Sequence, residues 1–179
     1  IPALLASAGL HHFLVRTQRR TRCSLVVESG EPRGTHDMAL LFGYGASAVC
    51  PYLALDIVRG LQRAGHLDGV SEEEAIGRYL HGLEKGVLKI MSKMGISTLQ
   101  SYRGAQIFEA VGLNRRVVDR YFAGTVSRVE GDGLEEIARA VRARHEDAYP
   151  CRPGSCDRPL PAGGRFRWRR RGEYHLFNP

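Results

Sequence analysis

The fold is decided by Ser24-Leu25-Val26-Val27-Glu28-Ser29-Gly30 and by a second apolar run, Ser47-Ala48-Val49-Cys50. Both runs are short and lack alternation, which is typical of strands buried on both faces of a parallel sheet. A helical pattern over residues 35–42 separates them, and Pro51 opens another helix through about residue 63. Strand, helix, strand and helix in this order predict an α/β fold of short parallel strands alternating with helices.

The longest predicted helix follows this unit. Ser71 and Glu74 have the spacing of a capping box at its beginning, and Gly95 can end it. A single apolar stripe runs along it, interrupted by three glycines: Gly77, Gly82 and Gly86. Each glycine costs about 1 kcal/mol relative to alanine in a helix interior. The glycines therefore indicate either a helix that is simply less stable than one with alanine at these positions, or the close approach of another backbone.

Local patterns predict the remaining elements of the body. Residues 3–18 have helical spacing, and residues 96–102 have the β-branched and aromatic content of a third strand. Short helices are expected over residues 104–111 and 114–123, and a last amphipathic helix over residues 133–146. These elements place the α/β body within residues 1–149.

Residues 150–179 differ in composition from the body. Prolines and glycines dominate the first part, so it cannot be helical and is expected to be a linker. Arg165-Phe166-Arg167-Trp168-Arg169 then alternates strictly, and the alternation resumes at residues 173–176. This pattern predicts a basic hairpin at the end of an irregular tail.

The charge is concentrated at the two ends of the chain. The 179 residues carry a formal net charge of +7, yet residues 28–150 hold 15 bases against 17 acids. A basic end indicates an anionic or nucleic-acid partner, a solvated surface, or a seam against an acidic neighbouring domain. Because the body has no basic stripe, nucleic-acid binding is the less favoured interpretation. No stretch of about 20 apolar residues occurs, so no membrane partner is expected.

The cysteines and histidines do not form a recognisable metal motif. Four cysteines in 179 residues are too few for a disulfide framework, which favours free thiols in a cytoplasmic protein. Cys151 and Cys156 are spaced slightly too widely for a zinc knuckle, and no second pair follows. His11, His12 and His36 could approach one another, but satisfied or surface histidines are the favoured interpretation. We expect neither a metal nor another cofactor in this chain.

The stretch with most polar side chains suited to specific hydrogen bonds lies around residues 91–106. Lys93, Gln100, Ser101 and Arg103 flank two junctions between predicted elements there. Polar groups near the edge of a parallel sheet are where α/β proteins place ligands. The competing interpretation is that these side chains bond backbone carbonyls in loops.

This same stretch, extended to residues 89–110, closely resembles the large subunit of the glutamate synthase family. Glu28-Ser29-Gly30-Glu31-Pro32-Arg33 is similar to the family's Glu-Ser-Gly-Glu-Ala-Arg segment. Residues 39–46 and 51–54 are similar to its Gly-Tyr-Gly-Ala and Asn-Pro-Tyr-Leu-Ala segments, and residues 172–179 match a stretch further on. The resemblance runs in order through essentially the whole chain.

The resemblance implies a fragment of a large multidomain enzyme. Such enzymes release ammonia from glutamine in a glutaminase domain and pass it internally to a (β/α)8 barrel. There it adds to 2-oxoglutarate, and the flavin reduces the 2-iminoglutarate to glutamate. Residues 1–149 resemble the C-terminal part of the central α/β domain, and residues 150–179 resemble the lead into the flavin mononucleotide domain. This chain is therefore expected to act as a scaffold between the two sites and to be inactive alone.

The resemblance also implies partners and cofactors that lie outside this chain. Flavin mononucleotide and an iron–sulfur cluster are expected in the parent enzyme, and no catalytic, cofactor or metal residue is carried over onto this sequence. The expected partners are the remaining domains of the large subunit, together with a small NADPH-oxidising subunit or ferredoxin. The sequence does not decide whether the electrons come from NADPH, NADH or ferredoxin. Lys93, Gln100, Ser101 and Arg103 are candidates for a domain interface or for the lining of the ammonia route.

Two positions depart from the family pattern. Cys50 stands where the family has Asn before Pro-Tyr, and Asp37 where a second His is common after His36. Neither departure affects a catalytic role, but both weaken a special site at His36. The rival hypothesis, a small nucleic-acid-binding module, requires Phe166 and Trp168 to be exposed for base stacking.

Overall fold

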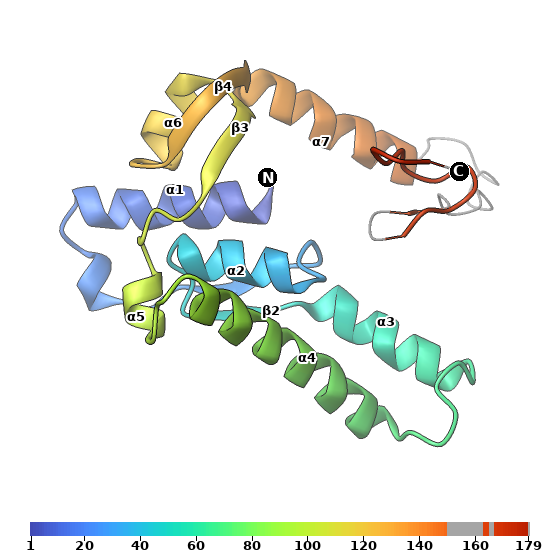
Figure 1. Cartoon of the computed structure of the whole chain (residues 1–179). Helices are drawn as coiled ribbons and strands as arrows, with labels where there is room; N and C mark the ends of the chain where they lie inside the picture. The colour runs from blue at the N-terminus through green and yellow to red at the C-terminus, as the bar shows by residue number, and fades with distance from the viewer. Residues whose placement is uncertain (150–162, 165–166, 179) are drawn as a thin grey trace. The chain divides into compact units, whose positions relative to one another are not determined.

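The structure is a computed structural model that describes residues 1–149, 163–164 and 167–178 (Figure 1). It divides into two compact units, Ile1–Val141 and Arg142–Pro179. The first unit contains nearly all of the helices and strands.

A βαβ unit forms from the stretch that decides the fold class. Strands β1 (Val26–Glu28) and β2 (Ala48–Cys50) pair in parallel, with helix α2 (Thr35–Gly43) between them in the chain. The predicted strands, helix and parallel α/β class are thus confirmed. Burial on both faces is wrong for both strands of this sheet, because Val26 of β1 is 69% exposed and no residue of β1 or β2 is fully buried.

A second βαβ unit follows later in the chain. Strands β3 (Glu109–Leu113) and β4 (Val126–Asp132) pair in parallel, and helix α6 (Arg115–Tyr121) connects them. Helix α6 confirms the helix predicted over residues 114–123. The helix predicted over residues 104–111 is wrong, and β4 was not predicted. The backbone hydrogen bonds that make these segments strands are supplied by pairing across the chain, which a local pattern does not reveal.

The third strand predicted over residues 96–102 is also wrong. A one-turn helix, α5 (Leu99–Tyr102), occupies this segment. Thr98 is its N-cap, since the Thr98 hydroxyl oxygen accepts a hydrogen bond from the Ser101 backbone N–H at 3.2 Å. Tyr102 is fully buried and donates its hydroxyl to the carbonyl of Ala39 at 3.1 Å, which anchors α5 to α2.

The other predicted helices are confirmed with small shifts at their ends. They are α1 (Ala3–Arg16), α3 (Tyr52–Arg63), α4 (Glu72–Lys93) and α7 (Leu134–Ala148), and a short 3₁₀ helix, η1 (Arg20–Arg22), follows α1. Ser71 caps α4 by accepting from the Glu74 N–H at 3.2 Å. The Glu74 carboxylate pairs with Arg78 at 2.6 Å rather than returning to Ser71, so half of the expected capping box forms.

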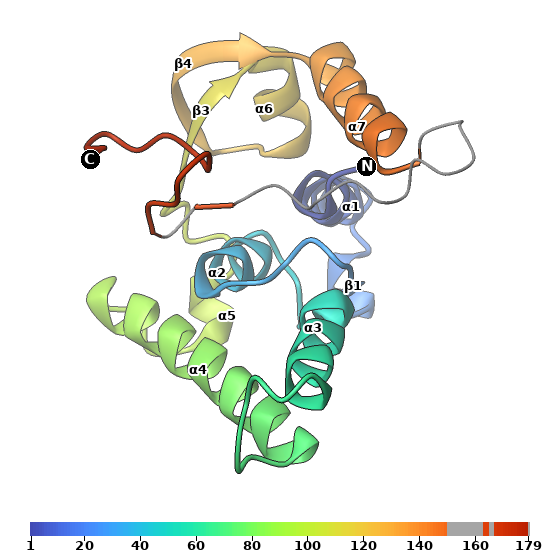
Figure 2. The same cartoon turned by 90° about the vertical axis from the view of Figure 1, so that its right-hand side faces the viewer.

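Two apolar clusters hold the first unit together. One joins α1 to α6, and the other joins α2 and α5 to α4, which lies alongside both α2 and α3 (Figure 2). The buried members are Ala8, Val117, Val118 and Phe122 in the first cluster and Met38, Val87, Met91 and Tyr102 in the second. The long helix predicted from residue 71 therefore packs through its apolar stripe, as its periodicity indicates.

The described part of the tail is held by local hydrogen bonds. The Glu173 N–H donates to the Gly163 carbonyl at 2.7 Å, and His175 bonds through its ring to the Gly164 carbonyl. The predicted linker falls on residues 150–162, which are outside the described residues, as is part of the predicted hairpin. Both therefore stay predictions.

The three glycines of α4 have different surroundings. A Cβ atom at Gly77 or Gly82 would meet nothing within 4 Å, whereas a Cβ at Gly86 would lie 2.4 Å from the Thr35 hydroxyl oxygen. Close approach thus explains Gly86 alone, and the neighbour is the side chain that begins α2 rather than a backbone.

This contrast predicts opposite effects of two alanine substitutions. Gly86→Ala should destabilise the protein by about 1–3 kcal/mol, because Thr35 is stiff at its Cβ and α2 must shift to relieve the overlap. Gly82→Ala in the same helix should stabilise it by up to about 1 kcal/mol. Urea unfolding followed by circular dichroism measures both changes. An equal gain in stability from the two variants would contradict the packing of α2 on α4.

Candidate functional site

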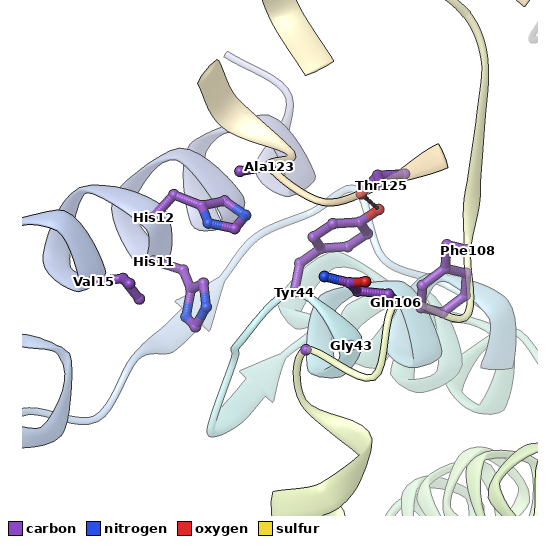
Figure 3. A pocket seen from close by; sticks show the side chains of 10 residues that line it. His11, His12, Val15, Gly43, Tyr44, Gln106, Phe108, Ala123 and Thr125 are labelled. Carbon is purple, nitrogen blue, oxygen red and sulfur yellow. Dashed lines mark hydrogen bonds between the residues drawn. The ribbon is translucent and has the colours of Figure 1, made fainter. Parts of the chain in front are cut away.

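A cavity of about 180 Å³, with both polar and apolar lining residues, lies beside the carboxyl end of α2 (Figure 3). Helix α1 contributes one wall, the segment between α5 and β3 another, and the segment between α6 and β4 a third. Its lining residues are His11, His12, Val15, Gly43, Tyr44, Gly104, Gln106, Phe108, Ala123 and Thr125. Four segments that are far apart in the sequence thus converge on one site.

The end of α2 has the geometry that this convergence requires. The N–H groups of Gly45 and Ala46 return to the carbonyls of Phe42 and Leu41, at 3.0 and 2.9 Å, in the pattern of a Schellman cap. Gly45 has a φ of +106°, and a Cβ there would lie 2.4 Å from Nδ1 of His11. A Cβ at Gly43 would likewise lie 2.5 Å from the Phe108 ring. Both glycines therefore allow neighbouring side chains to approach the backbone.

Tyr44, between the two glycines, is the central side chain of the site. Its ring stacks on Phe108 at 5.8 Å between centroids and meets Phe122 edge-on at 5.3 Å. Its hydroxyl lies 2.7 Å from the Thr125 hydroxyl, and burial raises the pKa of Tyr44 above its ordinary value. The phenol is consequently neutral and fixed in orientation, and Figure 3 shows it between His12 and Phe108.

The two histidines of α1 resist protonation. Nε of Arg20 donates to Nδ1 of His11 at 3.0 Å, so the proton of the neutral His11 ring is on Nε2. Burial, followed by the charges of His12, Arg20 and Arg103, lowers the pKa of His11 to about 4. Burial and Arg16 also lower the pKa of His12. Both rings are therefore neutral at pH 7.

The arginines near the cavity differ in how far they are satisfied. Arg20 also donates to the carbonyls of Cys23 and Gly45, at 2.7 and 2.8 Å. Arg103 has a buried Nε that makes no hydrogen bond within the part of the chain that the structure describes. A buried donor without a partner carries a desolvation penalty, so this nitrogen is notable among the site's groups.

The four residues singled out from the sequence are only partly brought together. Lys93 is exposed at the end of α4, and Gln100 is exposed on α5. The Ser101 hydroxyl accepts from Thr98 at 2.9 Å, which is a local bond within the turn. Arg103 is half-buried, immediately precedes Gly104 of the cavity lining and lowers the pKa of His11 through its charge, but it is not itself one of the lining residues.

Sequence reasoning did not single out Gln106 or Thr125. Gln106 has a φ of +55°, which is uncommon for a residue other than glycine, and it faces the cavity together with Tyr44. Thr125 precedes β4, a strand that the local pattern missed. His36 is exposed and does not line the cavity, unlike His11 and His12.

The described residues give no metal cluster or membrane span. Within residues 1–149, 163–164 and 167–178, no three His, Cys, Asp or Glu side chains gather as metal ligands. No helix in the same ranges has the length and apolar character needed to cross a bilayer. Cys23 and Cys50 have free thiols, whereas Cys151 and Cys156 are outside the described residues.

Comparison with known proteins identifies the family. A profile described as the glutamate synthase central domain matches residues 1–114. The chain belongs to this central-domain family. It is 50% identical over 179 residues to the glutamate synthase [NADPH] large chain of Bacillus subtilis, covering 100% of this chain and 12% of that protein. The glutamate synthase [NADH] of Schizosaccharomyces pombe is 45% identical, and the ferredoxin-dependent glutamate synthase 2 of Synechocystis is 43% identical.

These matches cover the whole of this chain but little of the relatives. The chain spans 8–12% of the length of the three glutamate synthases named above. The site lies within the central-domain match for α1, α2 and residues 104–108, while Ala123 and Thr125 come after it. None of the comparisons supports a nucleic-acid-binding module. Of its two discriminating aromatics, Trp168 is 43% exposed and Phe166 is outside the described residues.

The low pKa of His11 predicts a pH dependence of stability. As the pH falls from 7 toward 4, the unfolded chain takes up a proton at His11 near pH 6.5, while the folded chain resists until about pH 4. Stability should therefore fall across this window, and His11→Gln should reduce that fall. Thermal unfolding between pH 7 and pH 5 measures it, with His66→Gln at an exposed histidine as the control. The prediction fails if the stability of the His11→Gln variant falls as much between pH 7 and pH 5 as that of the unsubstituted protein.

Proposed function

We propose that this chain is a scaffold segment of a glutamate synthase and lies between the glutaminase and flavin sites of that enzyme. The observation that carries the proposal is 50% identity over all 179 residues to a glutamate synthase large chain. The parent reaction would convert glutamine, 2-oxoglutarate and a reductant into two glutamates. Residues 1–149 would form the C-terminal part of the central domain, and residues 150–179 would lead into the flavin domain.

The cofactors of the parent enzyme would be bound by other segments. Flavin mononucleotide would supply hydride transfer and an iron–sulfur cluster would supply electrons, and we assign no residue of this chain to either. Three of the similar relatives are named for NADPH, NADH and ferredoxin, yet this chain is 43–50% identical to each of them. We infer that a segment shared in this way does not select the electron donor. A small NADPH-oxidising subunit and ferredoxin would therefore dock elsewhere.

Lys93, Gln100, Ser101 and Arg103 would face a neighbouring domain or the ammonia route. Lys93 and Gln100 are exposed and so available to another domain, and Arg103 lies beside the cavity. Ser101 is engaged with Thr98, so its contribution would be to hold the turn that carries Gln100 and Arg103. These residues would position neighbouring elements rather than react.

The proposal predicts that the 179-residue chain alone has no glutamate synthase activity and binds no flavin tightly. The physical reason is that the proposed role is structural and that the catalytic groups would come from other segments. The purified chain should show no stoichiometric flavin absorbance after incubation with flavin mononucleotide and desalting. A yellow, stoichiometric complex would refute the proposal that other segments of the parent enzyme bind the flavin.

In the full-length enzyme, Gln100→Ala or Arg103→Ala should uncouple the two half-reactions. Glutamine would still be hydrolysed, but less 2-iminoglutarate would be reduced for each glutamine consumed, because ammonia would escape or the domains would misalign. The ratio of glutamine consumed to cofactor oxidised measures this, with Lys85→Ala at an exposed position of α4 as the control. Variants that lose only thermal stability and keep the parent ratio would assign these side chains a purely local role.

A further inference from the structure

The first parallel sheet has an open edge along β1. In the part of the chain that the structure describes, β1 has a single neighbouring strand, β2. At the two ends of β1, the Leu25 carbonyl and the Ser29 N–H both bond to the segment of β2, at 2.7 and 3.1 Å. Backbone groups of successive residues in a strand point to opposite edges, so those of Val26 and Glu28 point away from β2. Such a row of backbone groups is a template for another strand.

A groove of about 330 Å³ runs along this edge. Five consecutive residues, 25–29, form one wall, and helix α1 with Ile1 before it forms the other. The Glu31 carboxylate accepts the Ala3 N–H at 2.7 Å, so the beginning of α1 is tied to the loop after β1. The helix contributes mainly small side chains, which share one face of α1: Ala3, Ala6, Ser7 and Leu10. The fold therefore holds a space between α1 and the open edge of the sheet.

The walls of the groove leave apolar surface uncovered. Val26 on β1 is 69% exposed, and Leu10 on α1 is 47% exposed. Strands of parallel sheets are normally covered on both faces. The shape of the groove, its backbone groups and its apolar side chains thus fit one kind of occupant, an extended apolar segment.

We propose that an extended segment of the parent polypeptide, from outside residues 1–179, adds to β1 as a further strand in this groove. This inference rests on the proposed function, in which the parent enzyme is about eight times longer than this chain, as its Bacillus subtilis relative is. A segment of the same polypeptide is present at high effective concentration. Backbone hydrogen bonds to Val26 and Glu28 would supply affinity, and a β-branched or aromatic side chain beside Val26 would supply specificity.

A single extended segment fits the groove better than a second copy of this chain. Paired strands lie about 4.8 Å apart, so the occupant must come close to the edge of β1. Helix α1 forms the opposite wall, and a folded second copy would meet this helix before its own β1 reached that distance. One strand without a folded domain around it avoids this obstruction.

The test is amide hydrogen exchange in the full-length enzyme, read residue by residue by mass spectrometry with electron-transfer fragmentation. The Val26 and Glu28 amides should exchange about 100-fold more slowly there than in the 179-residue chain alone, because the added strand would accept their hydrogen bonds. The Val27 amide, which points toward β2, should be protected in both proteins and is the internal control. Equally fast exchange of Val26 and Glu28 in the two proteins would overturn the proposal. Protection that is lost on dilution would assign the edge to a second copy and overturn it too.

Two substitutions at one position locate the added strand. In the full-length enzyme, Val26→Lys should reduce the protection of the Glu28 amide about 10-fold or more, because a charged side chain on an edge strand blocks the addition of another strand. Val26→Thr keeps the β-branched shape and should keep the protection. Neither change should shift the melting temperature of the 179-residue chain by more than about 2 °C, because Val26 is exposed there. Undiminished protection of Glu28 in the Val26→Lys enzyme would overturn the proposal, and the comparison of the two unsubstituted proteins stands if that variant does not fold.

The ratio of glutamine consumed to cofactor oxidised, measured on the same full-length preparations, tests the proposed function separately. If Gln100→Ala uncouples the half-reactions while the Val26 and Glu28 amides exchange fast, the added strand is refuted and the scaffold role stands. If those amides are protected while Gln100→Ala and Arg103→Ala keep the parent ratio, the added strand is supported and the role of those two side chains is refuted.

Discussion

The carboxyl end of α2 is the constraint on which the first unit depends. Its Gly43 carbonyl accepts the Gly104 N–H at 3.0 Å, and its Gly45 carbonyl accepts Arg20 at 2.8 Å. Between them, Tyr44 reaches Phe122 and Thr125 of the second βαβ unit. One Schellman cap therefore joins the N-terminal segment, the turn after α5 and the second parallel sheet. The cavity exists because these three connections converge without filling the space between them.

The packing around this point depends on small residues as much as on large ones. A methyl group at Gly43 would collide with Phe108, and one at Gly45 would collide with His11. The aromatic contacts that these gaps permit, Tyr44 with Phe108 and with Phe122, contribute about 0.5–1.5 kcal/mol each beyond their buried area. Gly86 of α4 has the same function at the other end of α2, where its missing side chain leaves room for Thr35. Glycine placement thus fixes α2 at both ends.

Membership of the glutamate synthase central-domain family gives these contacts a context. The chain aligns in full with relatives that are about eight times longer, so its faces would meet other domains in a parent enzyme. Lys93 and Gln100, of the proposed interface set, are exposed on α4 and α5, whereas Arg103 of the same set is half-buried.

The sequence by itself determined the first βαβ unit and the long helix after Ser71, because apolar runs, helical periodicity and caps are local properties. It also indicated the family, through the segments that resemble the family's own. It misassigned residues 96–111, since the Thr98 cap and the burial of Tyr102 turn the first part into a helix and pairing with β4 turns the last part into a strand. It singled out Arg103 but not Gln106 or Thr125. Only the tertiary structure decided the cavity, because its walls come from four separate segments, and the pKa of His11 depends on burial and charges that become neighbours only on folding.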